Sequence, residues 1–70
     1  MADKIVLETS KRIKKLRINQ KLSQVILSEK AGINSNYYAK IERGEIKPSI
    51  EIYEKIAKAL GVKSNDLFPF

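Results

Sequence analysis

The 70-residue sequence contains no cysteine, no histidine and no tryptophan. Without cysteine the chain has no disulfide framework and no thiolate ligand for a metal. Without histidine it has neither a Ser-His-Asp nor a Cys-His catalytic arrangement, and no imidazole ligand. The remaining catalytic routes need carboxylate pairs or a lysine in a deep pocket, which so short a chain rarely builds. The sequence therefore predicts a binding protein without metal or cofactor, rather than an enzyme.

Long apolar runs are also missing. The longest cover residues 5–7 and 25–27, whereas a membrane span needs about 20 apolar residues and the core of a signal peptide about 7–15. We therefore expect a cytoplasmic protein with no membrane partner. Hydrophobic residues nevertheless make up 43% of the chain, which is enough for one compact folded domain over residues 1–70.

The charge is unevenly distributed. Lysine and arginine number 14 against 8 acidic residues, and five of the six net positive charges come from residues 1–21. Five cations stand within residues 11–17: Lys11, Arg12, Lys14, Lys15 and Arg17. A solvated helix face and an electrostatic footprint for phosphates both explain such a cluster, and composition alone does not decide between them.

The apolar spacing is helical nearly throughout. It predicts five short helices, over residues 8–20, 24–30, 35–43, 50–60 and 64–68. Ser23, Asn34 and Ser49 are the expected N-caps of three of them, and glycines follow three. No segment shows the alternation of a strand. We therefore predict an all-α protein, folded as a compact bundle of five short helices.

The helices at 24–30 and 35–43 are separated by a short break that contains Gly32. This spacing is typical of a helix-turn-helix. On a helical wheel, Tyr38 and Ile41 point inward. The outward residues of the second helix form a polar, cationic face: Ser35, Asn36, Ala39, Lys40 and Arg43. Asparagine pairs with adenine and lysine reaches guanine, so this face is suited to reading DNA.

The chain resembles the lambda-repressor-like (XRE-type) helix-turn-helix family of bacterial and phage regulators over residues 10–68. The family's motifs occur in order: Arg12-Ile13-Lys14-Lys15-Leu16-Arg17, Leu22-Ser23-Gln24, Lys30-Ala31-Gly32-Ile33, Ile41-Glu42-Arg43-Gly44, Pro48-Ser49, Lys55-Ile56-Ala57-Lys58-Ala59-Leu60-Gly61-Val62 and Asp66-Leu67-Phe68. Its length is also similar to that of the controller proteins of restriction–modification operons. The resemblance implies a bacterial or phage-encoded transcription regulator that binds double-stranded DNA.

The resemblance also implies roles for individual residues. The implied base-reading residues are Ser35, Asn36, Tyr37 and Lys40. Gln24 and Arg43 match positions that contact DNA phosphates, and the basic first helix adds Lys11, Lys14 and Arg12 as expected phosphate contacts. Arg17 and Glu42 match a structural ion pair between the first and third helices, which removes Arg17 from the phosphate-binding cluster.

Two positions depart from the family pattern. Lys21 stands where many members have a helix-ending glycine, so the first helix is expected to end differently. Ile26 replaces the glutamate that often completes a capping box. Together with Val25, Ile26 is expected to expose apolar surface, either packed locally or in contact with a partner.

The expected protein is a homodimer on a pseudo-palindromic operator, because a single copy reads only one half-site. The apolar C-terminal residues Leu67, Phe68 and Phe70 are the candidate interface, with packing into the core as the alternative. Transcription activation would need a contact with RNA polymerase, which no residue here identifies. The alternative function is a helical protein-interaction module, antitoxin-like or bridging, that keeps the fold and docks a protein.

Overall fold

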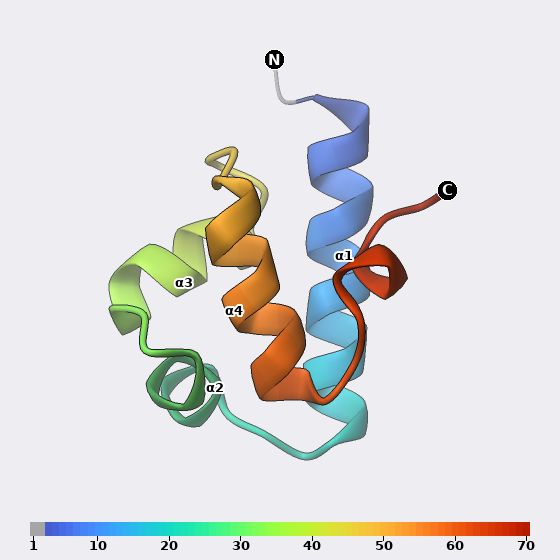
Figure 1. The fold of residues 1–70 in the computed structure, drawn as a ribbon. Helices are drawn as coiled ribbons and strands as arrows, with labels where there is room; N and C mark the ends of the chain where they lie inside the picture. The colour runs from blue at the N-terminus through green and yellow to red at the C-terminus, as the bar shows by residue number, and fades with distance from the viewer. Residues whose placement is uncertain (1–2) are drawn as a thin grey trace.

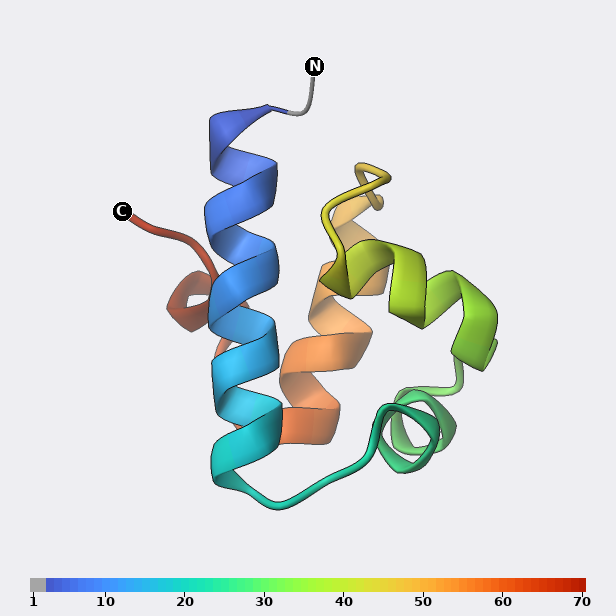
Figure 2. The same cartoon turned by 180° about the vertical axis from the view of Figure 1, so that it is seen from behind.

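The computed structural model describes residues 3–70, which form four α-helices and one short 3-10 helix. These are α1 (Lys4–Asn19), α2 (Gln24–Ala31), α3 (Ser35–Glu42), α4 (Ile50–Leu60) and η1 (Ser64–Leu67). No strand occurs in this part of the chain, so the all-α prediction is confirmed. In Figures 1 and 2, α1 and α4 run in roughly the same direction, with α2 near their C-terminal ends. Helix α3 crosses behind α4 in Figure 1 and in front of it in Figure 2.

Every helical element contributes to one apolar core. Its fully buried large side chains are Ile13 of α1, Leu27 of α2, Tyr38 and Ile41 of α3, Ile56 of α4 and Leu67 of η1. Burying each such side chain stabilises the fold by about 1.5–3 kcal/mol. Because the inward residues of α1, α3 and α4 are spaced three or four apart, these helices turn one buried stripe to this core. Helix α2 differs, since it buries Leu27 and Ser28 and leaves Val25 and Ile26 exposed.

Helix α1 begins at Lys4, so the predicted start at residue 8 is wrong. The carboxylate of Asp3 caps the helix by accepting a hydrogen bond from the Ile5 amide at 2.7 Å. Val6 is buried and lies one turn before Ser10 and two turns before Ile13, which extends the buried stripe to the helix start. The consecutive apolar residues 5–7 conceal this periodicity in the sequence.

The other helix ends follow local signals. The expected caps are confirmed: Ser23, Asn34 and Ser49 each accept a hydrogen bond from the first turn of their helix. Gly32 and Gly61 end α2 and α4 in the left-handed conformation. Small corrections remain, because α2 extends to residue 31 and α3 ends at residue 42.

The expectation that Lys21 makes the first helix end differently is wrong, and the predicted last helix is of another type. Lys21 adopts a φ of 59° after α1 and thus takes the left-handed conformation that glycine usually supplies. The predicted last helix over 64–68 is a 3-10 helix that ends at Leu67. In its first turn Asp66 accepts a hydrogen bond from the Lys63 amide at 3.0 Å, and the extended backbone at Phe68 ends it.

Candidate nucleic-acid interface

The α2–α3 turn is built from a left-handed glycine and an asparagine cap. Gly32 has a φ of 70° and ends α2, after which the Ile33 amide donates to the Ser28 carbonyl at 2.9 Å. Asn34 then accepts hydrogen bonds from the Asn36 and Tyr37 amides at 2.8 and 3.1 Å. Ser28 is 1% exposed, as expected where two helices approach closely. The turn therefore holds α3 at a fixed angle to α2.

The C-terminal end of α3 is held against α1 by an ion pair. Arg17 donates to both carboxylate oxygens of Glu42, from Nε at 2.9 Å and from Nη2 at 2.8 Å. Its third nitrogen donates to the Leu22 carbonyl at 2.7 Å. The side chains of Arg17 and Glu42 are only 12% and 2% exposed. The pair therefore connects α1, α3 and the segment between α1 and α2.

Glu42 is also the acceptor for two further side chains. The Tyr38 hydroxyl donates to it at 2.5 Å and the Gln24 amide at 3.2 Å. Burial would raise the pKa of Glu42, but the hydrogen bonds from Arg17, Tyr38 and Gln24 outweigh burial and hold that pKa below its ordinary value. Burial and the neighbouring carboxylate raise the pKa of the Tyr38 phenol. A charged Glu42 and a neutral Tyr38 thus fix the orientation of α3.

The surface of α3 carries one polar stripe. Asn36, Lys40 and Arg43 are exposed and spaced four and three residues apart, so they lie on one line along the helix. Ser35 is partly exposed and Tyr37 is 37% exposed, beside that line at the first turn. Asn36 and Lys40 therefore share the outward face opposite the buried Tyr38 and Ile41, and Ser35 and Tyr37 lie on either side of it.

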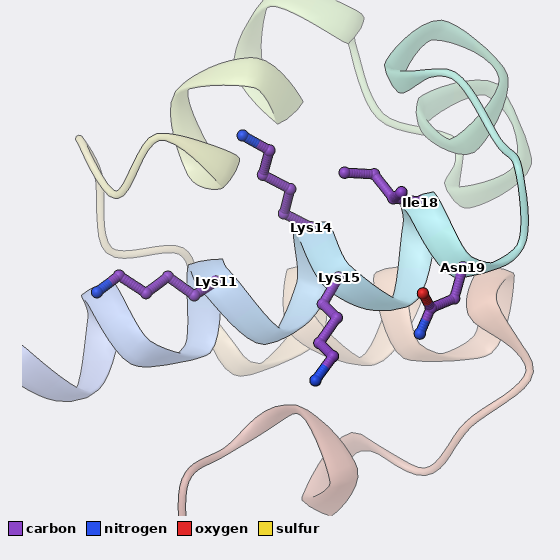
Figure 3. Close-up of a pocket in the computed structure, with 5 residues that line it drawn as sticks. All are labelled: Lys11, Lys14, Lys15, Ile18 and Asn19. Atoms are coloured by element: carbon purple, nitrogen blue, oxygen red, sulfur yellow. The ribbon is translucent and has the colours of Figure 1, made fainter.

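The basic residues of α1 lie in two directions. A shallow hollow is lined by Lys11, Lys14, Lys15, Ile18 and Asn19. In Figure 3, Lys14 and Ile18 extend toward the side of α2 and α3, while Lys15 extends toward the opposite side. Arg12 lines a different hollow together with Leu16 and Asp66. The structure therefore separates Arg12, on the η1 side of α1, from Lys14 on the α3 side.

Gln24 and Arg43 both have partners within the chain. Gln24 stands at the first position of α2 and directs its amide nitrogen to Glu42. Arg43 is the C-cap of α3, is exposed, and pairs with Glu45 in the following turn. Sequence reasoning missed Glu45, and it also missed Lys47, an exposed cation in the same turn. The signal available in the sequence for Lys47 was its charge and its place shortly after the third helix.

The three C-terminal candidates for an interface lie in different surroundings. Leu67 is fully buried in the core, so its expected place at a dimer interface is wrong. Phe68 is half-buried and meets the Tyr53 ring edge-on, with ring centroids 5.3 Å apart. Phe70 stacks on Phe68 and is 85% exposed. Of the three, Phe70 offers the most apolar surface to a second molecule.

Residues 3–70 contain no group of three or more acidic side chains placed to hold a metal ion. In the same residues, no helix is both long enough and apolar enough to cross a membrane.

The buried turn, the anchored α3 and its exposed polar stripe define an all-helical protein of the helix-turn-helix class.

Comparisons with known proteins agree with this class. The family described as "Helix-turn-helix" matches residues 13–67. The immunity repressor of Bacillus phage phi105 is 46% identical over 52 residues, which cover 74% of this chain and 36% of that protein. The control protein C.BamHI of Bacillus amyloliquefaciens is 34% identical over 71 residues, covering 100% of this chain and 88% of that protein.

A solved structure shows the same arrangement. SinR, the master regulator for biofilm formation, solved in complex with DNA, superposes with a TM-score of 0.80 at 37% identity over 84% of this chain and 95% of that chain. The chain belongs to the helix-turn-helix family of DNA-binding transcriptional regulators, which are binding proteins and not enzymes.

Proposed function

We propose that this chain regulates transcription by binding duplex DNA sequence-specifically, with α3 in the major groove. The observation that carries this proposal is the exposed polar stripe on α3, a helix whose opposite side is fixed by buried side chains and by the Arg17–Glu42 ion pair. The major groove is about 12 Å wide and admits an α-helix. Ser35, Asn36, Tyr37 and Lys40 are the proposed base-reading residues, since an amide, a hydroxyl and an ammonium group supply both donors and acceptors for base edges.

Phosphate contacts would position α3 in the groove. We assign them to Gln24, at the positive N-terminal end of α2, and to Arg43 at the end of α3. Lys14 and Lys11 extend this basic surface along α1, and Lys47 adds a cation in the turn after α3. Arg12 is the weakest of the proposed contacts, because it lies on the η1 side of α1.

The proposed active form is a homodimer on a pseudo-palindromic operator. Two half-sites one helical turn apart, about 34 Å, require two copies of α3 related by a two-fold axis. The exposed Phe70, stacked on Phe68, supports an interface at the C-terminal end. Its burial would also stabilise a chain whose own core is small.

Selection of bound sites from random duplex DNA tests the function. We expect an enriched half-site present twice, in inverted orientation. Asn36→Ala should weaken binding to that site by about 1–3 kcal/mol and relax the preference at one base pair. Lys14→Ala should weaken binding to all sequences alike and reduce the salt dependence. No enrichment, or an affinity independent of both salt and sequence, would contradict the proposal.

A protein-interaction module is the second candidate. It is supported by Val25 and Ile26, which are 52% and 45% exposed on the first turn of α2. In that case the double variant Val25→Ser with Ile26→Ser should no longer capture one protein partner. The wild-type protein would bind duplex DNA no more tightly than an unrelated cationic peptide does. Wild-type selection of a defined half-site would decide against this alternative.

A further inference from the structure

Arg43 is paired in the free protein with a carboxylate two residues further along the chain. Its Nε donates to Oε2 of Glu45, and its Nη2 donates to Oε1 at 3.4 Å. The two side chains are 55% and 50% exposed. The pair therefore lies on the surface at the C-terminal end of α3, beside the stripe proposed to face DNA.

The backbone after α3 brings these two side chains together. Gly44 has a φ of 74° and reverses the chain. The Glu45 amide then donates to the Lys40 carbonyl at 3.0 Å, and the Gly44 amide donates to the Ile41 carbonyl at 3.0 Å. These two bonds hold Glu45 against the last turn of α3. Glu45 consequently faces both Arg43 and Lys40, and these two cations lower the pKa of its carboxyl.

We propose that the Glu45 carboxylate binds the Arg43 guanidinium at the place where a DNA phosphate would otherwise bind it. A phosphate must then displace this carboxylate when DNA binds. The inference rests on the proposed function, because it requires Arg43 and Lys40 to meet DNA. A carboxylate and a phosphate present similar anionic oxygens to a guanidinium group. An exposed ion pair is weak and is exchanged readily, so Glu45 tunes binding without preventing it.

The expected consequence is weaker binding to duplex DNA of every sequence. Non-specific binding depends on phosphate contacts and the counterions they release. A carboxylate at the edge of the interface repels the phosphates of every duplex alike, and it competes with them for Arg43. Glu45 is thus a residue that lowers the affinity for every duplex without touching a base.

Glu45→Gln tests this assignment, with Glu54→Gln on the exposed surface of α4 as the matched control. Both changes remove one negative charge and leave the length of the side chain unchanged. Dissociation constants are measured for a random duplex and for the selected operator over a series of salt concentrations. We expect Glu45→Gln to bind both duplexes about 3- to 10-fold more tightly and both salt slopes to steepen by up to about 0.9, equivalent to one more phosphate contact. Glu54→Gln should change the affinity by less than about 2-fold.

The same measurement in an Arg43→Ala background separates this role from general repulsion. Without Arg43, the effect of Glu45→Gln should fall to the size of the Glu54→Gln effect. Equal effects of the two glutamine variants in the wild-type background would overturn the inference, as would an undiminished Glu45→Gln effect without Arg43. Absence of DNA binding by the wild-type protein is a different result, since it would remove the proposed function and this inference with it.

Discussion

Leu7 of α1 lies directly against Gly44, the residue after the C-cap of α3. A Cβ atom at position 44 would stand 2.6 Å from Cδ2 of Leu7 and 3.7 Å from Oγ of Ser10. Gly44 also has a φ of 74°, which side chains disfavour. Glycine is therefore favoured here by the backbone, and a Cβ would also push the flexible end of Leu7 aside. The contact joins the N-terminal half of α1 to the end of the helix proposed to read DNA.

Gly44→Ala should destabilise the fold more than Gly32→Ala. Gly32 has a similar φ of 70°, but nothing lies within 4 Å of a Cβ there. Gly32→Ala should therefore reduce the free energy of unfolding by about 1–2 kcal/mol, from the backbone alone. Gly44→Ala adds the displacement of the flexible end of Leu7, a side chain that is 38% exposed, and should cost at most about 1 kcal/mol more. Urea denaturation of both variants measures the difference, and equal losses would refute the steric role of Leu7.

Lys21→Gly should stabilise the protein. Lys21 has a φ of 59° in the reversal after α1, where a side chain costs about 1–2 kcal/mol and glycine does not. Part of this gain is offset by the greater freedom of glycine in the unfolded chain, so we expect a net gain of about 0.5–1 kcal/mol. The control is Lys15→Gly inside α1, which should lose about 1 kcal/mol. Thermal unfolding should show shifts of opposite sign.

Most helix ends were predictable because a local signal sets each of them. Ser23, Asn34 and Ser49 cap the helices that follow them, and Gly32 and Gly61 end α2 and α4. The start of α1 was not predictable from periodicity, since residues 5–7 are all apolar while only Val6 is buried. Asp3 was the available signal, as a carboxylate two residues before Ile5.

The candidate site was predictable to a smaller extent. The outward stripe of α3 follows from the helical period and from Tyr38 and Ile41 alone. The side of α1 on which each cation lies depends on how α1 packs against α3 and η1, which periodicity does not supply. The pairing of Arg43 with Glu45 depends on the positive φ of Gly44, so it required the folded backbone.

Thr9→Val should stabilise the core. Thr9 is fully buried, and its hydroxyl oxygen finds no hydrogen-bond partner within residues 3–70. Valine has nearly the same shape and removes the unsatisfied group, so we expect a gain of about 1 kcal/mol. Ser10→Ala is the neighbouring control, because the Ser10 hydroxyl lies 2.7 Å from the Ile41 carbonyl. That variant should lose about 1–2 kcal/mol, and a loss of stability for Thr9→Val would show that its hydroxyl is satisfied.

Arg17→Met should destabilise the fold far more than Arg43→Met. Arg17 neutralises a carboxylate that is 2% exposed, whereas the pair of Arg43 is half-exposed. Removing Arg17 leaves a buried charge and should cost about 3 kcal/mol, a large part of the roughly 4–10 kcal/mol expected for a domain of this length. Arg43→Met should leave the denaturation midpoint nearly unchanged. Similar midpoints for the two variants would contradict the buried character of the first pair.

Acid should weaken the fold through Glu42. The pKa of Glu42 lies below its ordinary value of 4.5 in the folded protein, since hydrogen bonds from three side chains to the carboxylate outweigh its burial. Above pH 4.5 both folded and unfolded states are ionised at this residue, and its stabilisation is fully present. As the pH falls below 4.5, the unfolded chain takes up the proton first, so the free energy of unfolding decreases until the pH passes the folded pKa. Glu42→Gln is less stable at neutral pH and should show a shallower decrease as the pH falls below 4.5. Tyr38→Phe removes one of the four hydrogen bonds to Glu42 and should shift the acid transition toward higher pH. An acid transition in Glu42→Gln as steep as that of the wild type would assign the transition to other carboxylates.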